Sequence, residues 1–306
     1  MVYLLFLLGF VLLVKGADWL VEGSSSLAKR LHISPMIIGL TLVAFGTSVP
    51  ELVVNVLAAV QGVTDIAVGN IIGSNIANIL LILGVTSIIM PLVINRQTRV
   101  GDIPLALLIV IWLALLTYDG TLTRMDAWVL ILFFIVFVYY ILTAGHVENH
   151  EPTNMPKRKM ATYIFFGILL LVVGWKRVVD GAIAFAQYVG LSERIIWLTV
   201  VAVGTSLPEL VTSVVAALKG NNNIAIGNIV GSNVLNIVVI LAITWFIVPL
   251  ELTQQWWFDI VICIGVTVLL LISFIMGKKE VLQRRQGGIF VLLYVAYVLY
   301  TLGVWA

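Results

Sequence analysis

Two glutamates, Glu51 and Glu209, lie in the middle of long apolar segments, and each directly follows a proline. The motifs that end in them are nearly identical, Gly-Thr-Ser-Val-Pro-Glu at 46–51 and Gly-Thr-Ser-Leu-Pro-Glu at 204–209. A carboxylate near the centre of a bilayer costs at least about 2.5 kcal/mol to insert, so it normally has a partner or lines an aqueous path. Neither segment supplies a basic partner away from its loops. The glutamates are therefore either protonated or neutralised by a cation, and the recurring hydroxyls favour the cation.

The prolines of these motifs predict a break in each helix. Pro50 has no N–H to donate to the carbonyl of Gly46, so the helix must open there. Carbonyl oxygens within 43–46 then become available to a ligand, and Pro208 has the same effect in the second copy. Structural kinks are common in membrane helices, but a carboxylate and two hydroxyls within one turn of the break favour a ligand shell.

A second polar motif follows each glutamate, Gly-Asn-x-x-Gly-Ser-Asn-x-x-Asn at 69–78 and again at 227–236. Taken singly, its amides serve packing as readily as binding, but their recurrence favours ligands. The spacing between the copies is constant, because 209 − 51 = 158 and 236 − 78 = 158. A constant spacing over so many polar positions indicates an internal duplication, which in a membrane protein is typical of a transporter.

Every candidate ligand in these motifs is an oxygen donor. Ca²⁺ takes about six to eight oxygen ligands, whereas Zn²⁺ or copper prefers His or Cys, and the three histidines fall at expected loops. The motifs therefore predict a Ca²⁺ or Na⁺ site. Its candidate side chains are Glu51, Glu209, Thr47, Ser48, Thr205, Ser206, Ser74, Asn75, Asn78, Ser232, Asn233 and Asn236.

The composition requires a membrane to surround these motifs. The chain is 61% hydrophobic and 10% charged, with a mean hydropathy of +1.14, which is outside the range of soluble domains of 306 residues. A net charge of +2 gives no nucleic-acid footprint, and the single cysteine forms no disulfide framework. No nucleophile–base pair indicates an enzyme.

The apolar runs predict an all-α polytopic membrane protein with ten transmembrane helices. Residues 1–144 form the first five-helix repeat, 145–159 a cytoplasmic linker and 160–306 the second repeat. The expected helices are 2–28, 35–61, 66–90, 100–118, 125–144, 160–188, 193–218, 224–248, 257–276 and 287–305.

The basic residues predict the orientation of these helices. With both termini outside, twelve lysines and arginines lie on the cytoplasmic side and only Arg124 and Arg194 lie in outer loops. Five helices per repeat is an odd number, so the second copy enters the membrane upside down as an inverted repeat. Glu51 and Glu209 then approach one midplane site from opposite sides, as alternating access requires.

The doubled motifs resemble the two alpha repeats of the calcium/cation antiporter superfamily, and within it the sodium/calcium exchangers of prokaryotes. The resemblance implies a Ca²⁺ site that adds main-chain oxygens of Ala44 and Ala202 to the two glutamates. It also implies that helices 2–28 and 160–188 slide together to switch access. The Na⁺ sites that it implies use Ser48, Ser74, Ser206 and Ser232.

One position departs from part of that superfamily. Several relatives, including the potassium-dependent exchangers, carry Asp where this chain has Asn236. The site then holds two formal negative charges, which suffices for one Ca²⁺ and argues against potassium dependence. The linker at 145–159 is also too short for the calcium-sensing domain of the animal exchangers.

Together these patterns predict a secondary antiporter that exchanges Na⁺ for Ca²⁺ in the plasma (inner) membrane. Apart from the lipid bilayer and the transported ions it needs no cofactor and no protein partner, and a monomer suffices. Two alternatives stay open: an antiporter of the same fold coupled to H⁺ or carrying another divalent cation, and a passive cation channel. Charges on the first and sixth helices are expected to pair locally, with a role in gating as the alternative.

Overall fold

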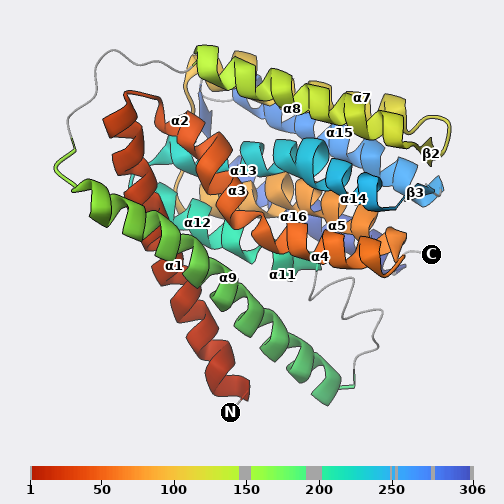
Figure 1. Cartoon of the computed structure of the whole chain (residues 1–306), viewed down its shortest axis with the longest axis horizontal. Coiled ribbons are helices and arrows are strands. Elements are labelled where there is room, and N and C mark those ends of the chain that lie inside the picture. The colour runs from red at the N-terminus through yellow and green to blue at the C-terminus, as the bar shows by residue number, and fades with distance from the viewer. Residues whose placement is uncertain are drawn as a thin grey trace.

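The computed structural model describes residues 2–144, 153–190, 202–248, 250–251, 254–276 and 280–303. The described chain is almost entirely helical (Figure 1). Seven of its helices are long and apolar enough to cross a membrane, and one bent pair raises the number to eight. Residues 193–201, which belong to the seventh expected helix, lie outside the described residues. The all-helical, multi-pass class is thus confirmed.

The helices of the first half follow the expected order, with π-helical segments in three of the spans. They are α1 (Val2–Leu31), α2 (Pro35–Ile38), η1 (Gly39–Val43), α3 (Ala44–Thr47), α4 (Val49–Val60), α5 (Thr64–Ala77), η2 (Asn78–Leu83), α6 (Gly84–Ile89), η3 (Thr98–Asp102), α7 (Ile103–Leu116) and α8 (Arg124–Ala144).

The second half repeats this pattern. Its helices are α9 (Lys157–Tyr188), α11 (Ala202–Thr205), α12 (Leu207–Leu218), α13 (Asn222–Leu235), η5 (Asn236–Leu241), α14 (Ala242–Ile247), α15 (Gln254–Met276) and α16 (Arg284–Thr301). α16 is the tenth expected helix and is not one of the seven apolar spans, and its side chain Leu292 is 70% exposed.

Two short ribbons join the halves to each other. β1 (Leu92–Val93) pairs antiparallel with β4 (Val281–Leu282), and β2 (Thr121–Leu122) pairs antiparallel with β3 (Leu250–Glu251). β1 and β3 occupy corresponding positions in the two halves, since 250 − 92 = 158.

The helix breaks occur close to the two prolines. α3 ends at Thr47 and α4 begins at Val49, with a bend of 48° between the two parts of the span. Ser48 at the break has φ −82° and ψ 8°, and Ser206 between α11 and α12 has φ −85° and ψ 5°. The predicted opening is therefore confirmed, with Pro50 in the first turn of the helix that follows it.

The polar motifs of the second type lie on the most enclosed spans. In an apolar 18-residue stretch of each span, the buried share is 78% for Ile66–Ile89 and 83% for Asn222–Ile247, but 22% for Arg124–Thr143. Small residues allow this enclosure, because α13 passes η1 with Gly227 against Gly39. The candidate site therefore lies inside the protein, away from lipid.

α1 and α9 form a closely packed pair along one flank of the bundle (Figure 1). Glycines bring the two backbones into contact: a Cβ at Gly16 would lie 2.8 Å from Gly167 O, and one at Gly174 would lie 2.8 Å from Gly9 O. Gly9 contacts Gly174 and the later Gly16 contacts the earlier Gly167, so the two helices run antiparallel.

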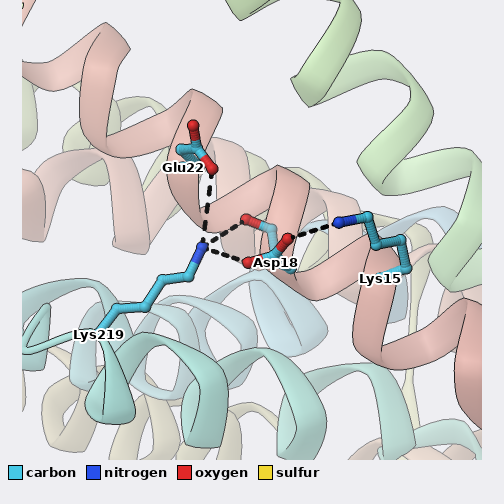
Figure 2. A network of polar contacts seen from close by, with 4 residues as sticks. All are labelled: Lys15, Asp18, Glu22 and Lys219. Atoms are coloured by element: carbon cyan, nitrogen blue, oxygen red, sulfur yellow. Dashed lines mark hydrogen bonds and ion pairs between the residues drawn. The ribbon is translucent and has the colours of Figure 1, made fainter.

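Four charged side chains join α1 to the end of α12 (Figure 2). Lys219 Nζ lies 2.5 Å from Asp18 Oδ1 and 3.9 Å from Glu22 Oε2, and it donates to the Asp18 carbonyl at 3.1 Å. Lys15 Nζ pairs with Asp18 Oδ2 at 3.1 Å, which confirms the expected local ion pair. Lys219 was not predicted from the sequence, because its acidic partners are about two hundred residues away in the chain.

We expect Lys219→Gln to lower stability by less than about 1 kcal/mol, because the side chain is 32% exposed and water screens such pairs. The thermal midpoint in detergent at low and high choline chloride measures this effect. Lys176→Gln, which removes an ion pair within α9, is the matched control. A loss of several kcal/mol would contradict the surface character of this network.

Candidate cation-binding site

Both glutamates are buried at the start of a helix. Glu51 lies in the first turn of α4 and Glu209 in the first turn of α12, and each side chain is 1% exposed. The free N–H groups and the dipole at a helix N-terminus favour a negative charge there. Among the described residues, no basic side chain forms an ion pair with either carboxylate.

Two serine hydroxyls lie close to Glu209, one from each half of the chain. Ser48 Oγ lies 3.1 Å from Glu209 Oε1 and 3.0 Å from Ser232 Oγ. Ser232 Oγ is itself 3.5 Å from the same carboxylate oxygen. In the corresponding place, Ser206 Oγ lies 3.4 Å from Ser74 Oγ. Two of the predicted serines, Ser48 and Ser232, are thus brought to Glu209, and the other two, Ser74 and Ser206, are brought to each other.

Four asparagines form a hydrogen-bonded cluster where α5 joins η2 and α13 joins η5. The Asn75 and Asn233 amides donate to each other's main-chain carbonyl, at 3.1 and 3.2 Å. Asn78 Nδ2 donates to Asn233 Oδ1, and Asn236 Nδ2 donates to Asn75 Oδ1, each at 2.9 Å. The amide oxygens of Asn75 and Asn233 are therefore engaged, while those of Asn78 and Asn236 remain available.

Four buried oxygens at this place have no hydrogen-bond donor: Glu51 Oε2, Glu209 Oε2, Asn78 Oδ1 and Asn236 Oδ1. A buried acceptor without a partner costs about 1–3 kcal/mol. A hard cation would satisfy oxygens of this kind, since carboxylate and amide oxygens are its usual ligands. The residues described include no group of three or more His, Cys, Asp or Glu suited to a metal, so neutral oxygens must complete this shell.

The main-chain oxygen of Ala44 is less free than the sequence predicts. It accepts the N–H of Ser48 at 3.0 Å and lies 3.2 Å from Thr47 Oγ1. A carbonyl oxygen has two lone pairs, so one position can still face a ligand. Ala202 begins α11 at the corresponding place in the second half.

Two residues of the site, Asn70 and Asn228, were not predicted from the sequence. Thr47 Oγ1 donates to Asn228 Oδ1 at 2.9 Å, and Thr205 Oγ1 donates to Asn70 Oδ1 at 3.1 Å. Both asparagines occupy the second position of the repeated motif, so its recurrence was a usable signal. The two bonds correspond, because 205 − 47 = 158 and 228 − 70 = 158.

Known proteins resemble this chain over nearly its whole length. The family model described as sodium/calcium exchanger protein matches residues 1–143 and 159–303. The putative antiporter CaxA of Alkalimonas amylolytica is 38% identical over 306 residues, which cover 95% of both proteins. The sodium/calcium exchanger MaX1 of Methanosarcina acetivorans is 32% identical over an alignment of 344 positions, which covers 97% of each protein.

A solved structure shares the fold over nearly the whole chain. It is the sodium-calcium exchanger NCX_Mj soaked with 2.5 mM Na⁺ and 0.1 mM Ca²⁺, which superposes with a TM-score of 0.86. The two sequences are 32% identical, and the match covers 97% of each chain.

Proposed function

Since this chain belongs to the sodium/calcium exchanger family, we propose that it exchanges Na⁺ for Ca²⁺ across the plasma (inner) membrane by alternating access. The family consists of cation antiporters, so the channel alternative is set aside. The observation that carries the proposal is the pair of buried glutamates, which have unpartnered oxygens and no basic neighbour among the described residues.

The same oxygens serve either cation in mutually exclusive occupancy. Ca²⁺ binds between Glu51 and Glu209, with the main-chain oxygens of Ala44 and Ala202 and the Asn78 and Asn236 amides completing its shell. Two carboxylates balance one Ca²⁺ in a low-dielectric site, which supports this assignment. Na⁺ ions replace it on the glutamates and on the hydroxyls of Ser48, Ser74, Ser206 and Ser232, with Thr47 and Thr205 beside them.

Asn75 and Asn233 play a different part in this proposal. Their amide oxygens accept hydrogen bonds from Asn236 and Asn78, so they orient the ligand amides rather than bind the ion.

We also propose that the chain spans the membrane ten times as two inverted repeats, with both termini outside. The antiparallel contact of α1 and α9 supports this, since these are corresponding helices: 167 − 9 = 158 and 174 − 16 = 158. Corresponding elements of two repeats run antiparallel only when one repeat is inverted. In each ribbon a strand of the first half pairs with a strand of the second half, β1 with β4 and β2 with β3, which agrees with the same relation between the repeats.

Coupling to H⁺ is the alternative that a transport assay must separate. A buried carboxylate can carry a proton in place of a metal ion, so paired glutamates suit either coupling ion. The hydroxyls around Glu209 favour Na⁺, because Na⁺ needs several neutral oxygens and a proton needs none.

The decisive experiment is radioactive Ca²⁺ uptake by proteoliposomes that are loaded with Na⁺ and diluted into Na⁺-free buffer. We expect uptake that requires the Na⁺ gradient and persists without K⁺. Vesicles without a Na⁺ gradient are the control, and a separate arm imposes a pH gradient alone. Uptake driven only by the pH gradient would replace Na⁺ by H⁺ as the coupling ion, and uptake that needs K⁺ would reverse the inference from Asn236.

A further inference from the structure

The amide of Asn228 joins both halves of the protein beside the cation site. It is fully buried, and its Oδ1 accepts the hydroxyl of Thr47, at the end of α3, at 2.9 Å. Its Nδ2 donates to Ser213 Oγ at 3.0 Å and to the main-chain oxygen of Glu209 at 3.3 Å, both on α12. One side chain thus connects the helix break of the first half with the glutamate turn of the second.

The acceptor that the Thr47 hydroxyl chooses determines whether the carbonyl oxygen of Ala44 keeps a free lone pair. One lone pair of that oxygen is taken by the Ser48 N–H at 3.0 Å. The hydroxyl of Thr47 lies 3.2 Å from the same oxygen but 2.9 Å from Asn228 Oδ1. A hydroxyl has a single proton, so donation to Asn228 leaves the second lone pair of Ala44 O to a cation.

We infer that Asn228 is a positioning residue of the cation site, which draws the Thr47 proton away from Ala44 O and keeps that carbonyl available as a ligand. The inference rests on the proposed function, in which Ala44 O binds Ca²⁺. Without the Asn228 acceptor, the Thr47 hydroxyl turns to the Ala44 carbonyl or to the Glu209 carboxylate, which are both proposed ligands, and competes with the ion. The effect falls on cation affinity and leaves the buried carboxylates in place.

The corresponding Asn70 is held less firmly. Its Oδ1 accepts Thr205 Oγ1 at 3.1 Å, but its Nδ2 has no partner, and neither does Oδ1 of Asn55, which lies on α4 outside the motifs. Position 55 corresponds to Ser213, since 213 − 55 = 158, and the Asn55 amide donates instead to the carbonyl of Glu51 at 2.8 Å. An amide anchored at only one end can rotate, so Asn70 orients Thr205 less effectively than Asn228 orients Thr47.

This difference supplies a matched pair of variants, Asn228→Ala and Asn70→Ala. We expect Asn228→Ala to weaken Ca²⁺ binding about tenfold, because a buried hydrogen bond is lost and its donor redirected, and Asn70→Ala to weaken it less than about threefold. Binding of radioactive Ca²⁺ to purified protein gives the affinity. Exchange rates at low and saturating Ca²⁺ should show a raised KM with a nearly unchanged maximal rate.

Thr47→Val tests whether Asn228 acts through the hydroxyl. In that background no proton competes for Ala44 O, so adding Asn228→Ala should change Ca²⁺ affinity less than twofold. Equal effects at Asn70 and Asn228, or full additivity with Thr47→Val, would overturn the inference. So would an Asn228→Ala protein with a lower thermal midpoint and unchanged Ca²⁺ affinity, which would show a purely structural role.

The binding measurement separates this inference from the proposed exchange. If wild-type protein binds Ca²⁺ but shows no Na⁺-driven uptake, the exchange proposal falls and the binding comparison still decides the role of Asn228. If wild-type protein binds no Ca²⁺, both fall together.

Discussion

Glu51→Gln and Glu209→Gln are each expected to reduce Na⁺-driven Ca²⁺ uptake at least about a hundredfold. Each change removes one of the two charges that neutralise a divalent ion in a buried site. Removing one partner of a buried ionic contact costs about 3–5 kcal/mol, and about 1.4 kcal/mol corresponds to a factor of ten in affinity. Both carboxylates are 1% exposed, so water cannot replace the missing charge.

The same variants should be at least as stable as wild type in the absence of cations. Glutamine removes a buried charge that has no basic partner among the described residues, and burying such a charge is costly. The thermal midpoint measured without Ca²⁺ should therefore stay level or rise. The increase that Ca²⁺ produces in wild type by binding the folded state should disappear. A misfolded variant would instead show a lower midpoint.

Asp102→Asn is the matched control for these variants. Asp102 is also a buried carboxylate, 5% exposed, but it accepts the Tyr140 hydroxyl at 3.1 Å and lies outside the motifs. We expect its neutralisation to change uptake less than about threefold, the effect of losing one hydrogen bond outside the site. If Asp102→Asn abolishes uptake while Glu51→Gln retains it, the site has been assigned to the wrong carboxylates.

Gly231→Ala is expected to have the second largest effect, a loss of about 1–3 kcal/mol in stability through overpacking. The added Cβ would lie 2.6 Å from Leu40 Cα, and the carbonyl of Leu40 is in contact as well. These are main-chain atoms of η1, so relief requires α13 to move away from the broken helix. Because Ser232 follows directly on α13, Ca²⁺ uptake should fall together with stability.

Gly265→Ala on α15 serves as the control for this change. A Cβ at Gly265 meets no atom within 4 Å, so alanine should be neutral or stabilise the helix by up to about 1 kcal/mol. Thermal midpoints and uptake of the two variants are compared at the same detergent and Ca²⁺ concentrations. Equal midpoints would mean that α13 and η1 are not in close contact.

Much of the fold and of the site could be predicted because the responsible physics is local. Hydropathy over about 20 residues decides which segments can span a membrane. Pro50 opens its helix because it has no N–H to donate to the carbonyl one turn earlier. The spacing of 158 residues between polar motifs required no structure to detect. The identity of the candidate oxygens followed from residue types alone.

The hydrogen-bond partners of those oxygens were decided by the tertiary structure. Asn75 and Asn78 are equally plausible ligands in the sequence, yet the structure engages the Asn75 oxygen and leaves that of Asn78 without a donor. The repeated motif marked Asn228 but did not show that it accepts the hydroxyl of Thr47, 181 residues away, and nothing in the sequence connected Lys219 with Asp18, 201 residues away. Whether a hydrogen bond forms depends on differences of a few tenths of an ångström in the donor–acceptor distance. Between segments so far apart in the chain, only the packing of one half against the other determines that distance.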